Sequence, residues 1–289
     1  MIDSPRFGRE FAPRKQRGNN RYFPSLLNLS GNVPVTSVAV VSSSGRIMKV
    51  IIKARKRETM AERTIRVGID DAPPVPMQLG NPDRGDFRGY EVDLLTEVCR
   101  RVGFRLSFRR ALWSVIVREL VTGEVDLVCS AATITREKER EVDFCSAHLD
   151  VTLAIVKRGG ITPDTAITGL RLGVRRGTTA ESYIRQHSAL EPSYTSESNE
   201  ELYALLAAGR LDAVIDDSPI ARWFAHCVPG LLFAGVLPGT EAAYAIMVRK
   251  GNNKLRAEIN RALEEMTKDG TRRALLRRWF GDDLSEVNR

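Results

Sequence analysis

The sequence has little histidine and little cysteine. Its 289 residues include three histidines and four cysteines, and these are scattered instead of grouped at the short spacings typical of metal ligands. Cys129 and Cys145 flank one segment and could approach each other, but a free cysteine commonly packs as a small apolar residue. We therefore expect isolated buried thiols, no metal and no cofactor.

Long apolar runs are also absent. The longest candidates, residues 33–41 and 47–52, are far shorter than the roughly 18 residues of a membrane-spanning helix. A secretory signal has a basic start, an apolar stretch and a small-residue cleavage site, and this order is not clear in residues 1–63. With 43% apolar and 28% charged residues, the composition is typical of a globular protein that can bury a sizeable core.

The excess positive charge is confined to the start of the chain. The formal net charge is +8, but residues 1–63 hold thirteen basic and four acidic residues, a net charge of +9. The remaining residues hold 31 basic and 32 acidic ones, a net charge of −1. A nucleic-acid-binding protein should carry its basic face on the folded domain, so this distribution indicates no nucleic-acid partner.

Residues 1–63 also differ from the rest in composition. They are rich in Arg, Ser, Asn and Gly and have few periodic apolar segments, which is typical of disordered chain. We interpret them as a disordered basic leader. The alternative is a mis-called extension upstream of the true start, which would then be Met48 or Met60.

From residue 64 onward, short apolar runs alternate with helical patterns. The runs that predict strands lie at residues 64–69, 104–108, 125–129, 151–156, 170–174, 211–215 and 243–248. The patterns that predict helices lie at residues 90–102, 114–121, 136–142, 178–186, 200–208, 219–225, 254–268 and 271–279. This alternation favours an α/β architecture with largely parallel sheets.

Seven segments occur in an order and spacing that resemble a known family. They are GYEVDLLTEVCRRVGFRLSF (89–108), WSVIVRELVTGEVDLV (113–128), AATITREKEREVDFCS (131–146), GVRRGTTAESY (173–183), VIDDSP (214–219), YAIMVRKG (244–251) and DGTRRALLRRWF (269–280). Together they are similar to the family-3 solute-binding proteins of polar amino-acid ABC importers. The resemblance covers about residues 64–282 and implies the periplasmic binding protein type II fold, which also forms the ligand-binding core of ionotropic glutamate receptors.

The resemblance implies two α/β lobes joined by two hinge strands, with the ligand held in the cleft between the lobes. Residues 151–156 and 244–248 correspond to the hinge crossings. Lobe 1 would comprise residues 64–151 together with a return over residues 243–289 that carries the C-terminal helices, and lobe 2 would comprise residues 152–242. The lobes would close on the ligand like a clamshell.

Three ligand contacts in lobe 1 follow from the resemblance. The carbonyl of Ala131 and the side chain of Thr133 correspond to positions that bind a ligand amine or hydroxyl. Lys138 stands where the family usually has an arginine that holds the α-carboxylate of the ligand. Lysine supplies a point charge instead of a planar fork, so this position departs from the family pattern. The alternative is that Lys138 belongs to a solvated charge cluster with Arg136 and Arg140.

Three further contacts are expected in lobe 2. Gly177 permits a tight strand-to-helix turn, and the free N–H groups of the helix start at Thr178 and Thr179 suit an anion. The resemblance places the ligand carboxylate there, although helix capping alone would explain one of the threonines. Asp217 corresponds to an acid that binds the α-amino group. An acid at a strand end can also serve as a helix N-cap.

Other positions depart from the family or have ordinary structural explanations. Trp113 is expected in the core, because Leu112 and Val115 beside it are apolar. His148 stands where a tyrosine is usual and is expected to be structural. Residues 70–74 lack the aromatic side chain that relatives offer after the first strand for stacking on the ligand. Together with Lys138, these changes weaken the case for a free α-amino acid.

No catalytic constellation is present, since the sequence contains no nucleophile elbow and no P-loop. The resemblance implies a non-enzymatic, monomeric substrate-binding protein of an ABC importer that captures a small polar ligand, an amino acid or a related carboxylate or amine. Its partner would be a membrane ABC permease, and its compartment the periplasm. Two alternatives stay open: a cyclohexadienyl or prephenate-type dehydratase on the same fold, which needs a carboxylate in the cleft as general acid, and a ligand-sensing module for a partner receptor.

Overall fold

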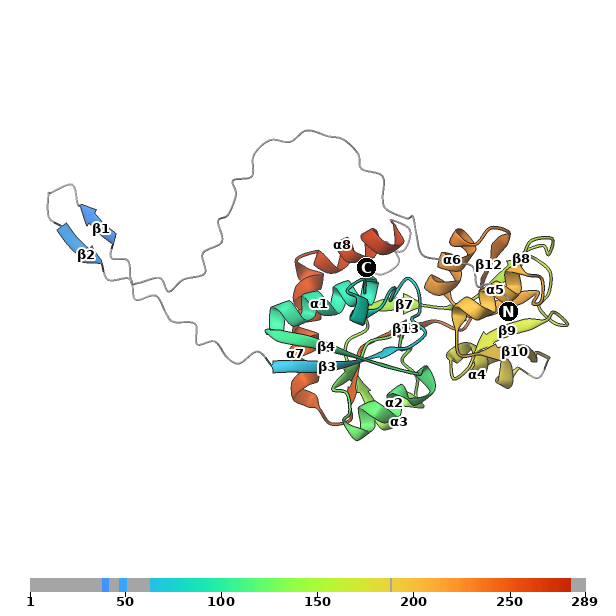
Figure 1. Ribbon diagram of the computed structural model, residues 1–289, viewed down its shortest axis with the longest axis horizontal. Helices are drawn as coiled ribbons and strands as arrows, with labels where there is room; N and C mark the ends of the chain where they lie inside the picture. The colour runs from blue at the N-terminus through green and yellow to red at the C-terminus, as the bar shows by residue number, and fades with distance from the viewer. Residues whose placement is uncertain (1–37, 42–46, 51–62, 188, 282–289) are drawn as a thin grey trace, which may run out of the picture. The chain divides into compact units, whose positions relative to one another are not determined.

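The computed structural model describes residues 38–41, 47–50, 63–187 and 189–281 (Figure 1). The chain divides into two compact units, Met1–Glu58 and Thr59–Arg289. Within the first unit, β1 (Val38–Val41) and β2 (Ile47–Val50) pair antiparallel, a pairing that the composition did not predict. Most of residues 1–63 lies outside the described residues, so their interpretation as a basic leader or extension stays a prediction.

The first five-stranded sheet contains strands from both ends of the second unit. Its order is β4-β3-β5-β14-β6. The strands are β3 (Arg63–Asp70), β4 (Phe104–Ala111), β5 (Leu127–Val128), β6 (Val142–Phe144) and β14 (Met247–Arg249). The helices that accompany it are α1 (Tyr90–Val102), α2 (Trp113–Thr122), α3 (Lys138–Glu141), α7 (Asn253–Lys268) and α8 (Thr271–Phe280), with a short 3₁₀ helix at Pro82–Arg84. We refer to this sheet and its helices as lobe 1.

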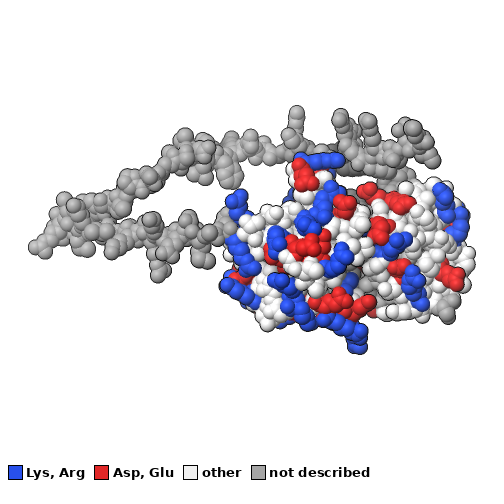
Figure 2. Space-filling model, turned by 60° about the horizontal axis from the view of Figure 1, so that its bottom comes forward, with Lys and Arg blue, Asp and Glu red and all other residues white. Residues whose placement is uncertain are grey.

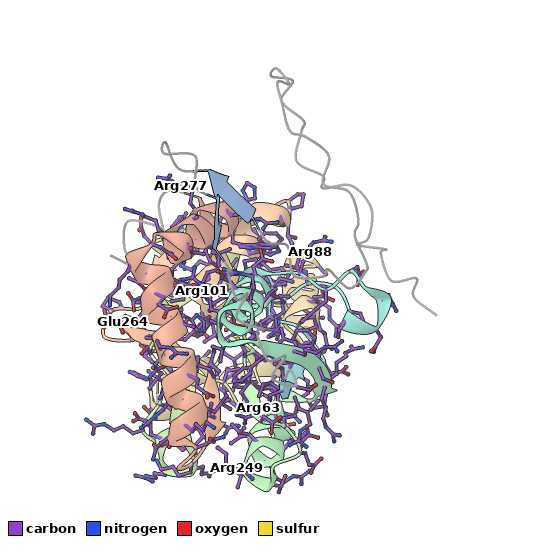
Figure 3. The ribbon with its side chains drawn as sticks, turned by 90° about the vertical axis from the view of Figure 1, so that its left-hand side faces the viewer. Arg63, Arg88, Arg101, Arg249, Glu264 and Arg277 are labelled. Carbon is purple, nitrogen blue, oxygen red and sulfur yellow. The ribbon has the colours of Figure 1, made fainter. Side chains whose placement is uncertain are left out.

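Helix α1 forms where the apolar spacing predicts it. Val92, Leu95 and Val98 lie on its buried face, one above the other at the period of an α-helix. The helix ends at Gly103, whose φ of 83° belongs to the left-handed region that glycine tolerates best. Helix α7 packs beside α1, and Figure 3 shows Glu264 at the outer edge of α7.

The second five-stranded sheet lies entirely between residues 153 and 236. Its order is β10-β9-β11-β8-β12. The strands are β8 (Leu153–Arg158), β9 (Leu172–Arg175), β10 (Pro192–Ser196), β11 (Ala213–Asp217) and β12 (Leu231–Val236). The helices that accompany it are α4 (Thr179–Gln186), α5 (Asn199–Ala207) and α6 (Ser218–Cys227). We refer to this sheet and its helices as lobe 2.

A separate pair of strands joins the two lobes. Strands β7 (Leu149–Val151) and β13 (Ala242–Tyr244) pair antiparallel and lie between the lobes in Figure 1. Each hinge crossing predicted from the sequence, residues 151–156 and 244–248, is therefore divided in the structure. Strand β8 continues from β7 into the sheet of lobe 2, and β14 continues from β13 into the sheet of lobe 1.

Both sheets are mixed, so the expectation of largely parallel sheets is wrong in part. Strand β14 runs antiparallel to β5 and β6, and β8 runs antiparallel to β11 and β12. Parallel neighbours require a crossover helix, whereas β8 and β14 enter their sheets directly from the joining strands. The edge strands β10 and β12 were not predicted. PSYTS contains no apolar run, and LLFAGV is a short apolar run that does not distinguish a strand from a buried helix segment.

The described surface agrees with the near-neutral charge of residues 64–289. Figure 2 shows Lys and Arg interspersed with Asp and Glu on the face that it presents. Among the described residues, no helix has both the length and the apolar character needed to cross a membrane. All four cysteines are free; Cys99, Cys129 and Cys145 are buried as expected, but Cys227 is exposed, because it is the last residue of α6.

Candidate ligand-binding site

A cavity between the two lobes brings together all six residues that the sequence predicted as ligand contacts. They are Ala131, Thr133 and Lys138 from lobe 1, and Thr178, Thr179 and Asp217 from lobe 2. Seven further residues line the same cavity: Pro74, Trp113, Ser130, Arg175, Asn199, Asp216 and Ile220. The structure therefore places the predicted residues around one space, and ligand contact by each of them stays a prediction.

Lys138 is the cation that lobe 1 contributes to the cavity. Its Nζ donates a hydrogen bond to the Thr133 carbonyl at 3.1 Å and lies 5.3 Å from the centre of the Trp113 ring. Burial lowers the pKa of Lys138, while the nearby Asp217 raises it. Arg136 and Arg140 are exposed, so Lys138 does not share their solvated environment and points into the cavity instead.

Asp217 is the anion that lobe 2 contributes. The Tyr244 hydroxyl donates to its Oδ2 at 2.7 Å, and the hydroxyls of Thr179 and Thr133 lie 3.4 and 3.5 Å from its two carboxylate oxygens. Burial raises the pKa of Asp217, while Tyr244 and Lys138 lower it. Asp217 occupies the N-cap position of α6 but makes no capping bond with its side chain, so the capping explanation for this acid is wrong.

The start of α4 combines capping with exposure to the cavity. The Glu181 N–H donates to the Thr178 hydroxyl at 3.4 Å, which confirms Thr178 as the N-cap. The Gly177 N–H donates to the Glu181 carboxylate at 2.7 Å. Thr179, the first residue of the helix, turns its hydroxyl toward Asp217. Both threonines line the cavity, so capping by Thr178 leaves a role in ligand binding open.

Ala131 is held in an unusual backbone conformation. Its φ of 49° lies in the left-handed region, which costs a residue with a Cβ some conformational energy. Glu91 compensates for this, because both oxygens of its carboxylate accept from the Ala131 N–H, at 2.8 and 3.0 Å. With its N–H occupied in this way, Ala131 retains its carbonyl as the group available for a ligand, as the resemblance implies.

Glu91 belongs to a buried group of three potential metal ligands. The ligand atoms of Glu91, Cys129 and His148 lie within 4.8 Å of one another. His148 is fully buried, as a structural residue should be, and its Nε2 lies 3.3 Å from Glu91 Oε1. Since Glu91 already receives the Ala131 N–H, we assign this group to support of the cavity wall.

Trp113 belongs to a buried hydrophobic cluster, as expected, and it also lines the cavity. Its indole ring lines the cavity and faces Lys138. Its Nε1 donates to the Gly177 carbonyl of lobe 2 at 3.1 Å. Trp113 therefore supplies the aromatic surface that residues 70–74 lack, and Pro74 supplies an apolar one.

Sequence reasoning also missed Arg175, Asn199 and Tyr244. Arg175 ends a strand whose residues are otherwise apolar or glycine, LGVR, and an arginine in such a buried strand is a signal that could have been used. Asn199 follows the helix-capping Ser198. Polar residues are so common at a helix start that one there does not indicate a binding site. Tyr244 was quoted within a motif but was assigned to the hinge.

Asp216, the buried neighbour of Asp217, also accepts hydrogen bonds from neutral groups. Its Oδ1 accepts from the Asp217 N–H at 2.8 Å, and its Oδ2 accepts from the Tyr203 hydroxyl at 3.3 Å. Burial and the nearby Asp217 charge together raise the pKa of Asp216 to about 8, while Arg175 opposes them. The raised pKa favours the protonated form of the Asp216 carboxyl at neutral pH in the folded protein.

The substitution Asp216→Asn is expected to change how stability depends on pH. The pKa of Asp216 is higher in the folded protein than in the unfolded one, where it is about 3.9. Asp216 therefore contributes fully to the free energy of unfolding below about pH 4. This contribution is lost as the pH rises toward 8, at about 1.4 kcal/mol per pH unit. Asn cannot ionise; its oxygen still accepts from the Asp217 N–H, and its NH2 group can donate to the Tyr203 hydroxyl in place of accepting from it. The variant should match wild type near pH 4 and melt several degrees higher near pH 9, as measured by calorimetry.

The matched control for this experiment is Asp71→Asn, whose side chain is 51% exposed. It should melt in parallel with wild type over the same range of pH. If the Asp216→Asn curve is also parallel to that of wild type, Asp216 is charged in the folded protein and the assignment of a protonated carboxyl is wrong.

Comparisons with known proteins agree with this geometry. Residues 65–282 match the family described as bacterial extracellular solute-binding proteins, family 3. The L-cystine-binding protein TcyJ of Escherichia coli (strain K12) is 28% identical over 267 residues, which cover 90% of this chain and 99% of that protein. An ancestral arginine-binding protein bound to glutamine is 31% identical with a TM-score of 0.69, over 76% of this chain and 98% of that one.

A further solved structure bears on the enzyme alternative. It is the ancestral amino acid-binding protein AncCDT-1, a precursor of cyclohexadienyl dehydratase. It is 29% identical to this chain with a TM-score of 0.65, over 75% of this chain and 95% of that one. Binding proteins and a dehydratase lineage therefore both occur among proteins similar to this chain.

Proposed function

The chain belongs to the bacterial extracellular solute-binding proteins of family 3, and we propose that it captures an amino acid by closing its two lobes around it and delivers it to a membrane ABC permease. The bound molecule would be a zwitterion, held by its ammonium and carboxylate groups. The extracellular character of the family suggests that the protein would act in the periplasm. We further propose that it acts as a monomer.

The observation that carries this proposal is the pair of opposite charges in one cavity. Lys138 comes from lobe 1 and Asp217 from lobe 2, and the charge of each residue shifts the pKa of the other. An α-amino acid presents a cation and an anion a few ångströms apart, so its carboxylate would pair with Lys138 and its ammonium with Asp217. Charge-assisted hydrogen bonds of this kind are the strong ones.

The proposed closure is supported by contacts that run from the cavity to the joining strands. Tyr244 lies on β13, one of the two joining strands, and its hydroxyl donates to Asp217. Thr133 forms an isolated β-bridge with the same tyrosine. A ligand that binds Asp217 would therefore act directly on a residue of the hinge, and a ligand that favours the closed arrangement shifts the population toward it.

The proposal predicts that at least one amino acid stabilises the protein. A ligand at about 100 times its Kd stabilises the folded state by about 2.7 kcal/mol, which raises the Tm by roughly 5–10 °C for a protein of this size. The measurement is a thermal-shift screen of the twenty common amino acids, cystine, opines and polyamines. Asp217→Asn is the matched control and should lose the shift. The absence of any shift with wild type would contradict the proposal.

A dehydratase acting on prephenate-like cyclic acids is the second candidate. It is favoured by the similarity to a dehydratase precursor and by Asp216, a protonated carboxyl that lines the cavity. Against it, both oxygens of Asp216 accept hydrogen bonds from Tyr203 and Asp217. The same screen separates the two functions if prephenate is included and recovered for mass spectrometry, because a binding protein returns it unchanged.

A further inference from the structure

The cavity contains a second group of polar residues that the ammonium and carboxylate of an amino acid would not use. Arg175 and Asn199 line the cavity. Asp70, at the end of β3, is the partner of Arg175 and is not part of the lining. We call Asp70, Arg175 and Asn199 the side-chain subsite. Arg175 and Asn199 would face the part of the ligand that differs between amino acids, and Asp70 supports Arg175 as its ion-pair partner.

Arg175 stands between Asp70 and the cavity. Its Nη2 donates to Asp70 Oδ2, and its Nε donates to the Glu197 carbonyl at 2.9 Å. The exposed fraction of the side chain is 7% for Arg175 and 1% for Asp70, so solvent screens this ion pair little. The negative charge of Asp70 is thus neutralised by a cation that the protein itself provides.

Asn199 is the part of the subsite that lacks a partner. Only 4% of this residue is exposed, and within the described part of the chain neither its Oδ1 nor its Nδ2 has a hydrogen-bond partner. A buried amide without partners is unfavourable, and here both of its polar atoms belong to a residue that lines the cavity. One amide offers one acceptor and two donors, which complements another amide or a hydroxyl and not a full charge.

Resting on the proposed function, we infer that the cavity selects amino acids with a neutral, hydrogen-bonding side chain, of the amide or hydroxyl class, and that Arg175 excludes cationic side chains by occupying Asp70. A ligand amide pairs with Asn199 in this arrangement. A ligand ammonium or guanidinium meets the guanidinium of Arg175 at the same place, without an anion to receive it.

The charges of the whole cavity agree with this selection. Lys138 balances Asp217 and Arg175 balances Asp70, so a ligand without net charge leaves the cavity neutral. A basic or acidic side chain would add an uncompensated charge to a site shielded from water, which is a common way in which binding sites reject a wrong partner.

The test compares affinities by calorimetric titration of the full chain. Glutamine, asparagine, serine and threonine represent the neutral class, lysine and arginine the cationic class, and glutamate the anionic class. We expect the best neutral ligand to bind wild type at least about tenfold more tightly than any charged one, since a charge left unpaired in a buried site is costly. If lysine, arginine or glutamate binds as tightly, the inference is wrong while the proposed function stands.

A reversal of specificity gives the sharper result. In Arg175→Met the cation is lost and the apolar stem is kept, which frees Asp70 to receive a ligand cation, so the affinity for lysine or arginine should rise by about tenfold or more. Adding Asp70→Asn to this variant should abolish the gain. Arg176→Met is the matched control, because Arg176 is 57% exposed, and it should keep the wild-type order of ligands.

The outcomes distinguish the two proposals. If no amino acid binds wild type, the proposed function fails and this inference fails with it. If amino acids bind but a folded Arg175→Met gains nothing for cations, the role of Arg175 is wrong. Should Arg175→Met not fold, Arg175→Lys keeps the charge and must keep the exclusion of cations, and Asn199→Ala must lose affinity for glutamine relative to lysine.

Discussion

Asp217→Ala is expected to weaken amino-acid binding by roughly 30- to 4000-fold, the equivalent of about 2–5 kcal/mol for breaking a charge pair shielded from water. The cause is the loss of the anion that would receive the ligand ammonium. Asp217 is held for this purpose by Tyr244 and Thr179, from the joining strand β13 and from α4. Calorimetric titration with the best ligand of the screen measures the loss.

The variant Asp217→Asn separates the charge from the shape of this side chain. It should lose most of the same affinity, because an amide cannot replace the negative charge. Asp217 makes no capping bond to α6, so neither variant should unwind that helix. Asp71→Asn, the exposed acid after β3, serves as control and should bind as wild type does. An affinity of Asp217→Ala within about threefold of wild type would contradict the assignment, because Asp217 would then contribute less than about 0.7 kcal/mol to the binding free energy.

Some loss of stability without ligand is also expected for Asp217→Ala, but less for Asp217→Asn, whose amide oxygen can still accept from Tyr244. An open cleft would leave Asp217 in water, but in this structure its carboxylate is half-buried and accepts from the Tyr244 hydroxyl at 2.7 Å. Removing the acceptor leaves that buried hydroxyl without its partner. Tyr244→Phe isolates this contribution, because it removes the hydrogen bond and keeps the carboxylate for the ligand.

Lys138→Met is expected to weaken binding by a similar factor, about 30- to 4000-fold, because it removes the cation that would hold the ligand carboxylate. Methionine preserves the apolar stem that lies against the Trp113 ring, so the cavity should keep its shape. Isothermal titration gives the affinity. The melting temperature without ligand should change little, because relief from burying the Lys138 charge is offset by leaving Asp217 without its nearby cation.

Arg136→Met is the matched control for Lys138. It lies two residues earlier and is exposed, so it should bind the ligand as wild type does. If Lys138→Met also binds as tightly as wild type, Lys138 has no part in holding the carboxylate. That role would then belong to the start of α4 at Thr178 and Thr179, and the description of the site in lobe 1 would be wrong.

Much of the local structure follows directly from the sequence. Helix α1 has the predicted bounds, because its apolar residues repeat at helical spacing and Gly103 ends it. The mixed direction of the sheets could not be predicted in this way, because apolar runs look alike in parallel and antiparallel strands. The edge strand β10 was missed because PSYTS has no apolar run, and β12 was missed because a short apolar run such as LLFAGV can also belong to a buried helix.

The residues predicted for the site came from short motifs, and each motif belongs to one lobe. Ala131, Thr133 and Lys138 lie within one segment. Thr178 and Thr179 lie shortly after β9, and Asp217 is the last residue of β11. Such motifs determine the local turn, helix start or strand end that presents a side chain. A motif from one lobe carries no information about the residues of the other lobe, so it cannot predict contacts that are made across the cleft.

The sequence by itself therefore determined the α/β class, most of the helices and the short segments that carry the six predicted cavity residues. The tertiary structure alone decided which side chains meet there. Trp113 reaches Gly177 over 64 positions, and Arg175 reaches Asp70 over 105 positions. The physical reason is that the local pattern of apolar residues depends on neighbours three or four positions away, whereas the pairing of a buried charge depends on the packing of both lobes.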